Sequence, residues 1–135
     1  MTARFNAIGL VASDMAATLA FYRRLGLEIP ADAETQPHVE AELPGGLRLM
    51  WDTEDTIRSF QPEWTPAAQG EGRVSLAFAC DGSAEVDRLY TELTEAGYTG
   101  HLKPFDAPWG QRYASVRDPD GNAVDLFAPL PGQSG

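Results

Sequence analysis

The chain has 135 residues, 43% of them hydrophobic and 10% aromatic, and its 10 basic and 20 acidic side chains give a net charge of -10. These values fit one globular domain with a substantial core. The acidic balance argues against nucleic acid or an anionic membrane as a partner, because binding to either requires a positively charged surface. It permits a cationic or neutral small ligand.

The single cysteine, Cys80, excludes an internal disulfide and is typical of a reducing compartment. No stretch has the pattern of a signal peptide or of a membrane-spanning helix. We therefore expect a cytoplasmic protein.

The first half of the chain predicts a strand, a helix and further strands. Residues 5–11 have the composition of a strand. Ser13 is a suitable N-cap, and apolar residues recur at helical spacing between Met15 and Leu25, with Gly26 as a stop. The elements expected after this helix are a strand that begins at 27–29, strands over 38–43 and 47–52, and a short helix over 53–60.

The second half repeats this order. Residues 73–80 predict a strand, and Ser83 caps a helix that stops at Gly97. A hairpin follows, with strands at 113–117 and 123–127 joined by the turn-rich segment 118–122. The repetition predicts an α+β fold of tandem βαβββ modules that form a cupped mixed sheet with the helices on the outside.

We expect a single domain over residues 1–135. Its parts are module one at about 1–64, a linker at about 65–72 and module two at about 73–130. Neither module buries its sheet alone, so the modules are expected to pack together or across a dimer.

The leading strands of the two modules separate large side chains from small ones. The large ones, suited to helix packing, are Ile8, Leu10, Val74, Leu76 and Phe78. The alternate positions are Ala7, Gly9, Val11, Ser75, Ala77 and Ala79. The small side chains predict a hollow on the face away from the helix, and ligand sites are concave and mostly apolar.

Aromatic residues are the first candidates to line such a hollow. Trp109 lies between Pro108 and Gly110, which predicts a bend and an exposed indole for stacking. Trp51 alternates with Leu47 and Leu49 and is assigned to the core. The residues that fit either ligand enclosure or the core are Phe60, Trp64, Phe105 and Phe127.

Polar residues are expected to orient the ligand. Arg112, Ser115 and Asp125 are the candidates to reach its carbonyl, hydroxyl or amine groups. Asp125 equally fits a carboxylate bonded to Arg48 or Arg112, and Arg112 better fits a structural role. Cys80 is expected to be a small core residue.

Both halves of the chain resemble the vicinal-oxygen-chelate superfamily, which includes glyoxalase I, extradiol dioxygenases and bleomycin-resistance proteins. The segments that carry the resemblance are 8–14, 21–27, 74–81 and 118–127. Further segments are similar to the mitomycin-resistance members, which bind a drug. They are 28–30, 37–38, 51–53, 62–64, 100–104 and 109–113.

The metal-dependent members of this superfamily hold a divalent ion with His, Gln or Glu from four strands. The matching positions here are Ala7, Met50 (with Arg48 as the other choice), Ser75 and Asp125. Asp125 alone keeps a carboxylate, whereas a catalytic metal normally needs about three protein ligands. We therefore expect no metal and no other cofactor.

The resemblance implies a metal-free binding protein that sequesters a planar aromatic or quinone-type antibiotic and confers self-resistance without turnover. It also implies that His38 lies opposite Trp109 as a slot for a planar ring, and that the protein is a homodimer. The expected ligand-binding residues are His38, Met50, Phe60, Trp64, Phe105, Trp109, Arg112, Ser115, Asp125 and Phe127.

Three alternatives stay open. One is a metal-dependent lyase, isomerase or dioxygenase with an unusual ligand set. A second is a metal-free enzyme that uses Asp125 as a general base. A third is a carrier that hands the drug to an exporter.

Overall fold

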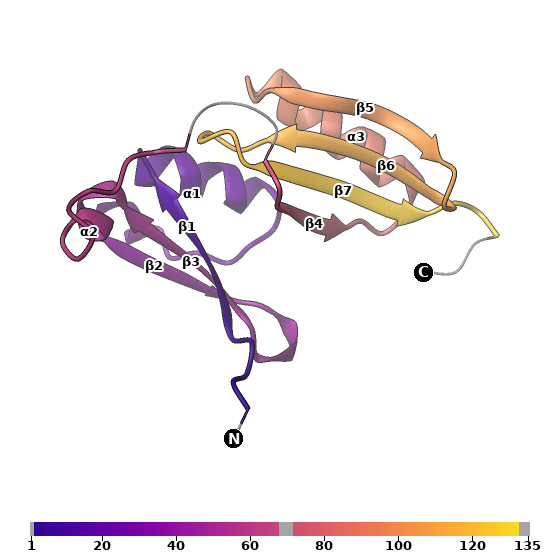
Figure 1. Cartoon of the computed structure of the whole chain (residues 1–135). Helices are drawn as coiled ribbons and strands as arrows, with labels where there is room; N and C mark the ends of the chain where they lie inside the picture. Colours follow the sequence, from indigo (N-terminus) through magenta and orange to yellow (C-terminus); the bar gives the residue numbers. More distant parts are fainter. Residues whose placement is uncertain (1, 68–71, 133–135) are drawn as a thin grey trace. The chain divides into compact units, whose positions relative to one another are not determined.

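The computed structural model describes residues 2–67 and 72–132 of an α+β chain (Figure 1). It contains two compact units, Met1–Ala68 and Gln69–Gly135. The expected modules, each with a helix packed on a sheet, are confirmed. The division between the units falls in the expected linker at about 65–72, of which residues 68–71 lie outside the described part.

The first unit is built on a three-stranded sheet with the order β1-β3-β2. Strand β1 runs parallel to β3, and β2 runs antiparallel to it. The strands are β1 (Ala7–Ala12), β2 (His38–Glu42) and β3 (Arg48–Thr53). The helices are α1 (Met15–Arg24) and α2 (Glu54–Arg58), with 3-10 turns η1 (Ala33–Thr35) and η2 (Pro44–Gly46).

The N-cap of helix α1 lies one residue after the expected cap. Asp14, not Ser13, is the N-cap, because the Asp14 carboxylate accepts a hydrogen bond from the Ala17 N–H at 3.1 Å. Gly26 ends the helix as expected and has a φ of 96°, a conformation that glycine adopts without a steric penalty.

The strand expected to begin at residues 27–29 is absent, so that prediction was wrong. The Leu27 N–H still bonds the Tyr22 carbonyl at 3.3 Å, within the C-terminal turn of α1. The Arg23 guanidinium donates to the carbonyls of Ile29 (3.2 Å) and Pro30 (2.5 Å). These side-chain bonds draw the segment back onto the end of α1 instead of into a sheet.

The core of the first unit lies between α1 and its sheet. Trp51 of β3 is fully buried, as expected, and its ring lies 5.3 Å from the ring of Tyr22 on α1. The strand registers place Ile8, Leu10 and Leu49 on the same face as Trp51. The large side chains of β1 therefore point to the side of the sheet that carries the helix.

The second unit has a four-stranded sheet with the order β4-β7-β6-β5. Strand β4 is parallel to β7, and the other neighbours are antiparallel. The strands are β4 (Ser75–Ala79), β5 (Gly100–Ala107), β6 (Gln111–Arg117) and β7 (Ala123–Pro129). One helix, α3 (Ser83–Glu95), packs on this sheet; its N-cap is Gly82, so the expected cap at Ser83 was one residue late.

The expected hairpin between β6 and β7 is confirmed. The Asp118 carboxylate accepts hydrogen bonds of 2.9 Å from the N–H groups of Asp120 and Asn122 and from the Asn122 side-chain amide. This local network holds the turn. Its strands place Asp125 beside Ser115, and Phe127 beside Tyr113.

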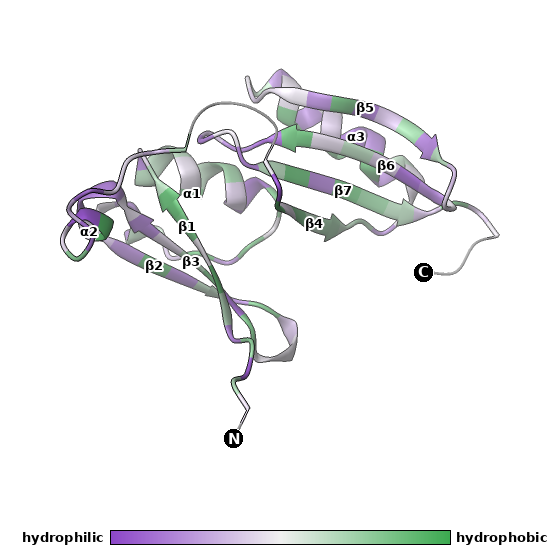
Figure 2. Cartoon of the chain, in the orientation of Figure 1, coloured by the Kyte–Doolittle hydropathy of each residue, from purple (hydrophilic) through white to green (hydrophobic). Residues whose placement is uncertain are grey.

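The sheet of the second unit has two chemically different faces. Val124 and Leu126 of β7 pair with Leu76 and Phe78 of β4, and this face carries α3. We call the other face the distal face; its residues on β4, β6 and β7 are Ser75, Ala77, Ala79, Tyr113, Ser115, Asp125 and Phe127. Figure 2 shows hydrophobic stretches on the strands that hydrophilic positions interrupt.

Candidate functional site

Three aromatic rings form a cluster at one end of the distal face. Trp109, in the turn between β5 and β6, lies 5.3 Å from Tyr113 and 6.4 Å from Phe105 between ring centroids. Phe105 lies 6.1 Å from Tyr113, and all three contacts are edge to face. The Trp109 side chain is nevertheless 59% exposed, and its Nε1–H donates to Gln111 at 2.8 Å. The turn thus presents an indole surface that the protein itself only partly covers.

A hydrogen-bonded pair adjoins this cluster. The Tyr113 hydroxyl donates to Asp125 Oδ2 at 2.5 Å. Asp125 is 8% exposed, and the neighbouring Ser115 is 1% exposed. Burial, reinforced by the bond to the carboxylate, raises the pKa of Tyr113 to about 12, so the phenol keeps its proton at neutral pH.

Arg112 lies on the opposite face of the same strand. Its guanidinium donates to both carboxylate oxygens of Asp87 on α3, at 2.8 and 3.1 Å, and to Asp106 of β5 at 3.0 Å. These bonds raise the pKa of Arg112 further above its ordinary value, despite some desolvation. Arg112 therefore ties β6 to α3 and β5, as its structural assignment predicted, and the structure does not bring it to the distal face.

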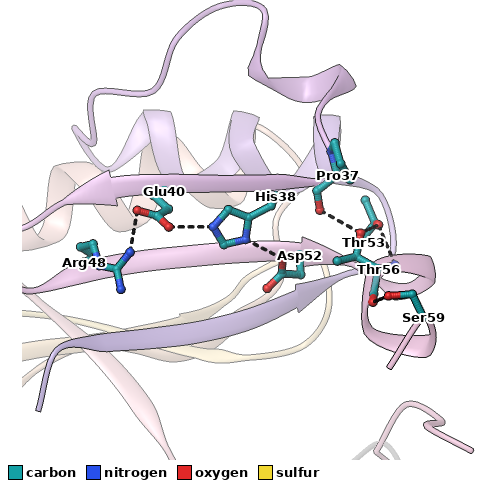
Figure 3. A network of polar contacts seen from close by, with 8 residues as sticks. All are labelled: Pro37, His38, Glu40, Arg48, Asp52, Thr53, Thr56 and Ser59. Atoms are coloured by element: carbon teal, nitrogen blue, oxygen red, sulfur yellow. Dashed lines mark hydrogen bonds and ion pairs between the residues drawn. The ribbon is translucent and has the colours of Figure 1, made fainter. Parts of the chain in front are cut away.

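The first unit carries a separate polar network on the face of its sheet away from α1 (Figure 3). His38 Nδ1 lies 2.6 Å from Asp52 Oδ1, and His38 Nε2 lies 2.7 Å from Glu40 Oε2. Arg48 forms an ion pair with Glu40 at 2.8 Å and donates to Asn6 at 2.7 Å. His38 is thus bracketed by two carboxylates on neighbouring strands.

The network changes the proton affinities of its members. Hydrogen bonds that the His38 ring donates to Glu40, and then to Asp52, raise the pKa of His38 above its ordinary value. The same bond to His38, with that to Arg48, lowers the pKa of Glu40. The two carboxylates therefore stabilise the charged form of His38 relative to a free histidine, although its side chain remains 41% exposed.

The other expected site residues of the first unit are dispersed. Met50 shares the His38 face of the sheet, beside Gly9. Phe60, just after α2, is 64% exposed. The Trp64 ring packs under the Arg58 guanidinium at 5.2 Å, a cation–π contact. His38 belongs to the first unit and Trp109 to the second, and the slot expected from this pair stays a prediction.

The residues at the four expected metal positions do not suit a divalent ion. In the first unit, Ala7 has no donor atom, and Met50 offers a thioether, which prefers soft metals. In the second unit, Ser75 pairs with Ala123 and is thus two residues out of register with Asp125. Within 2–67 and 72–132, no group of three or more His, Cys, Asp or Glu side chains is placed to hold a metal.

Tyr113, Glu40 and Asp52 are the site residues that sequence reasoning missed. The sequence carried a signal for Tyr113 and Glu40, each two positions from a candidate, whereas Asp52 lies across the sheet from His38 and only the strand register reveals it. Tyr113 precedes Ser115 by two residues, and Glu40 follows His38 by two. Side chains two apart on a strand share a face, so each candidate implied these neighbours.

Each unit consists of a sheet with a helix packed on one face and with aromatic or titratable side chains on the other face. This arrangement defines a class of α+β proteins built from two similar modules. The chain belongs to the Glyoxalase/Bleomycin resistance protein/Dioxygenase superfamily, whose family model matches residues 4–126. It is also 28% identical over 127 residues to the uncharacterized protein YraH of Bacillus subtilis (strain 168), covering 91% of this chain and 96% of that one.

Solved structures share the fold. A glyoxalase/bleomycin resistance protein/dioxygenase family enzyme from Burkholderia phytofirmans PsJN superposes with a TM-score of 0.79 at 19% identity, over 95% of this chain and 100% of that one. A glyoxalase/bleomycin resistance protein/dioxygenase from Nocardioides gives a TM-score of 0.70 at 26% identity, over 100% and 91%. In the described part of the chain, no helix has both the length and the apolar character needed to cross a membrane.

Proposed function

We propose that this chain is a metal-free binding protein that sequesters an aromatic or quinone-type antibiotic, and so confers self-resistance without turnover. The observation that carries the proposal is the exposed indole of Trp109, which Phe105 and Tyr113 support from the side. A planar ligand ring that stacks on Trp109 covers apolar surface that is otherwise exposed to water.

The energy of such a complex has to come from several contacts. Aromatic pairing contributes about 0.5–1.5 kcal/mol beyond area burial, whereas a micromolar dissociation constant corresponds to about 8 kcal/mol. We propose that Phe105 and Phe127 supply further apolar contact and that Ser115 and Asp125 orient the polar groups of the ligand. Phe105 and Phe127 both flank Tyr113 in the strand registers.

The resemblance to the mitomycin-resistance members supports a mitomycin-type quinone as the ligand. The same resemblance supports a role for His38, Met50, Phe60 and Trp64, a homodimeric assembly and, as a further step, transfer of the drug to an exporter. Sedimentation analysis tests the dimer separately from binding.

Isothermal titration with mitomycin C tests the binding proposal. We expect saturable binding that a chelator does not change, with the drug recovered chemically intact. Trp109→Ala should weaken binding about tenfold, which corresponds to about 1.4 kcal/mol. Phe5→Ala is the matched control, because Phe5 is also exposed (68%) but lies before β1 in the first unit.

Three results would contradict the proposal. If Trp109→Ala and Phe5→Ala reduced the affinity for mitomycin C equally, Trp109 would not be part of the binding site. Binding or turnover that disappears with the chelator and returns with one divalent ion would favour the metal-dependent enzyme. An absence of any binding would rule out mitomycin C as the ligand.

A metal-free enzyme is the second candidate, and the buried Asp125 carboxylate favours it. A carboxylate shielded from water can act as a general base towards a bound substrate. Turnover of such a substrate, with many product molecules formed per chain, would favour an enzyme over a storage protein. Asp125→Asn should then abolish turnover while substrate binding persists.

A further inference from the structure

We infer that the Asp125 carboxylate binds a protonated amine carried by the aromatic ligand. This inference rests on the proposed function, because it assumes that a ring stacks on Trp109. It adds to the proposed function a preference, among planar aromatic compounds, for those that carry a protonated amine. It also gives Asp125 a role other than metal ligation.

Among residues 2–67 and 72–132, none forms an ion pair with Asp125, although this carboxylate is buried. Asp125 is 8% exposed, yet the one hydrogen bond that its side chain accepts from the described residues comes from the neutral Tyr113 hydroxyl. Buried carboxylates are ordinarily paired with a cation or bonded to several N–H groups, because removing the charge from water is costly. A ligand ammonium group would supply the missing counter-charge.

Asp118, the other buried carboxylate in the described part of the chain, shows the usual arrangement. Asp118 is 4% exposed, and it accepts hydrogen bonds from two backbone N–H groups and from the Asn122 amide. Its charge is therefore compensated within the turn that it holds together. Asp125 has no such set of donors, so a requirement of the hairpin does not explain its burial.

Tyr113 links the carboxylate to the stacking surface. Its ring contacts Trp109 at 5.3 Å between centroids, and its hydroxyl bonds Asp125 at 2.5 Å. The hydroxyl keeps lone pairs that can accept a hydrogen bond from an ammonium group while its own O–H still donates to Asp125. A ligand with its ring on Trp109 and its amine at Asp125 would therefore span Tyr113.

Two further features favour an organic cation. Aromatic ring faces attract ammonium groups, and Phe105, Trp109 and Tyr113 provide such rings beside the carboxylate. The net charge of -10 raises the local concentration of cations around the protein. One carboxylate and one phenol hydroxyl are too few donors for a catalytic metal, which normally has about three protein ligands.

A matched pair of ligands tests the inference. Daunorubicin is a planar quinone with a primary amine, and N-acetyldaunorubicin has the same ring system without the positive charge. In isothermal titration of the full chain, we expect daunorubicin to bind about tenfold or more tightly than its acetylated form, since hydrogen bonds between charged groups contribute about 1.5–3 kcal/mol.

Two variants separate charge recognition from a structural role. Asp125→Asn and Tyr113→Phe both alter the bond between the two side chains, so a structural role predicts similar effects from both. Recognition of charge predicts that Asp125→Asn abolishes the preference for daunorubicin, while Tyr113→Phe retains it. Near-ultraviolet circular dichroism verifies that both variants are folded.

The outcomes also distinguish this inference from the proposed function. Equal affinity for the two ligands, or a preference that survives in Asp125→Asn, would overturn the inference and leave aromatic binding in place. If neither daunorubicin nor its acetylated form binds, the inference fails. If mitomycin C also fails to bind, the proposed function fails with it. A preference that vanishes equally in both variants would assign the pair a structural role and overturn the inference.

Discussion

The ionisation of Tyr113 gives the sharpest test of the geometry of the distal face. With a pKa of about 12 rather than 10, Tyr113 should be about one tenth ionised at pH 11, where an ordinary tyrosine is about nine tenths ionised. Ultraviolet absorbance of the phenolate measures this ionisation, and the difference between wild type and Tyr113→Phe isolates the single residue. A component titrating near pH 10 would refute the arrangement described here.

The Asp125→Asn variant separates the contribution of Asp125 to the raised pKa of Tyr113 from the contribution of burial. Burial is the largest cause, and the hydrogen bond and charge of Asp125 come second. Removing the carboxylate charge should therefore lower the pKa of Tyr113 without returning it to 10. A complete return would mean that the carboxylate, not burial, controls the tyrosine.

The same ionisation contributes to stability in a predictable pH range. The folded protein holds the Tyr113 proton more tightly than the unfolded chain, so the residue stabilises the fold fully below pH 10 and loses this contribution as the pH rises through about 12. The loss should reach at most about 1.4 kcal/mol by pH 11, because the folded and unfolded populations then differ about tenfold in proton binding. Denaturant unfolding of wild type and Tyr113→Phe at about pH 9 and pH 11 measures it, and a constant difference between them would contradict the linkage.

Two further predictions concern the first unit and the packing of α3. Because hydrogen bonding raises the pKa of His38, its contribution to stability is complete below the unfolded pKa of about 6.5 and is lost as the pH rises through the folded value. Glu40→Gln removes the largest cause, so NMR titration should show a lower His38 pKa; an unchanged value would disprove the contact. Gly100→Ala should cost about 1–3 kcal/mol in the free energy of unfolding, since its methyl group would meet the Tyr90 hydroxyl, with Cζ at 2.9 Å. Tyr90→Phe should reduce that cost in a double-mutant cycle, and simple additivity would refute the clash.

Local patterns determined much of the fold. The helical spacing from Met15, the stops at Gly26 and Gly97, and the turn chemistry of 118–122 depend on neighbours within a few residues, and each appears in the structure. The alternation of large and small side chains along β4 follows the period of two of a strand and could also be predicted from the sequence. Such features follow from backbone preferences and from strand or helix periodicity.

Other features depended on partners distant in the sequence. Residues 27–29 have the composition of a strand start, but the Arg23 side chain donates hydrogen bonds to the carbonyls of Ile29 and Pro30. Arg112 was a candidate for the ligand site until the register of β6 turned it toward Asp87 on α3. A shift of one residue in a strand exchanges its faces, so sequence alone could not decide this.

The sequence by itself thus determined the class of fold, the hairpin and the individual candidates Trp109 and Asp125. Tertiary structure decided which of these candidates meet: Tyr113 bridges the indole and the carboxylate across two neighbouring strands. It also bracketed His38 between Glu40 and Asp52. The physical reason is that residue type and local spacing are properties of the sequence itself. Burial, side-chain pairing and proton affinity arise from contacts between strands that only folding brings together.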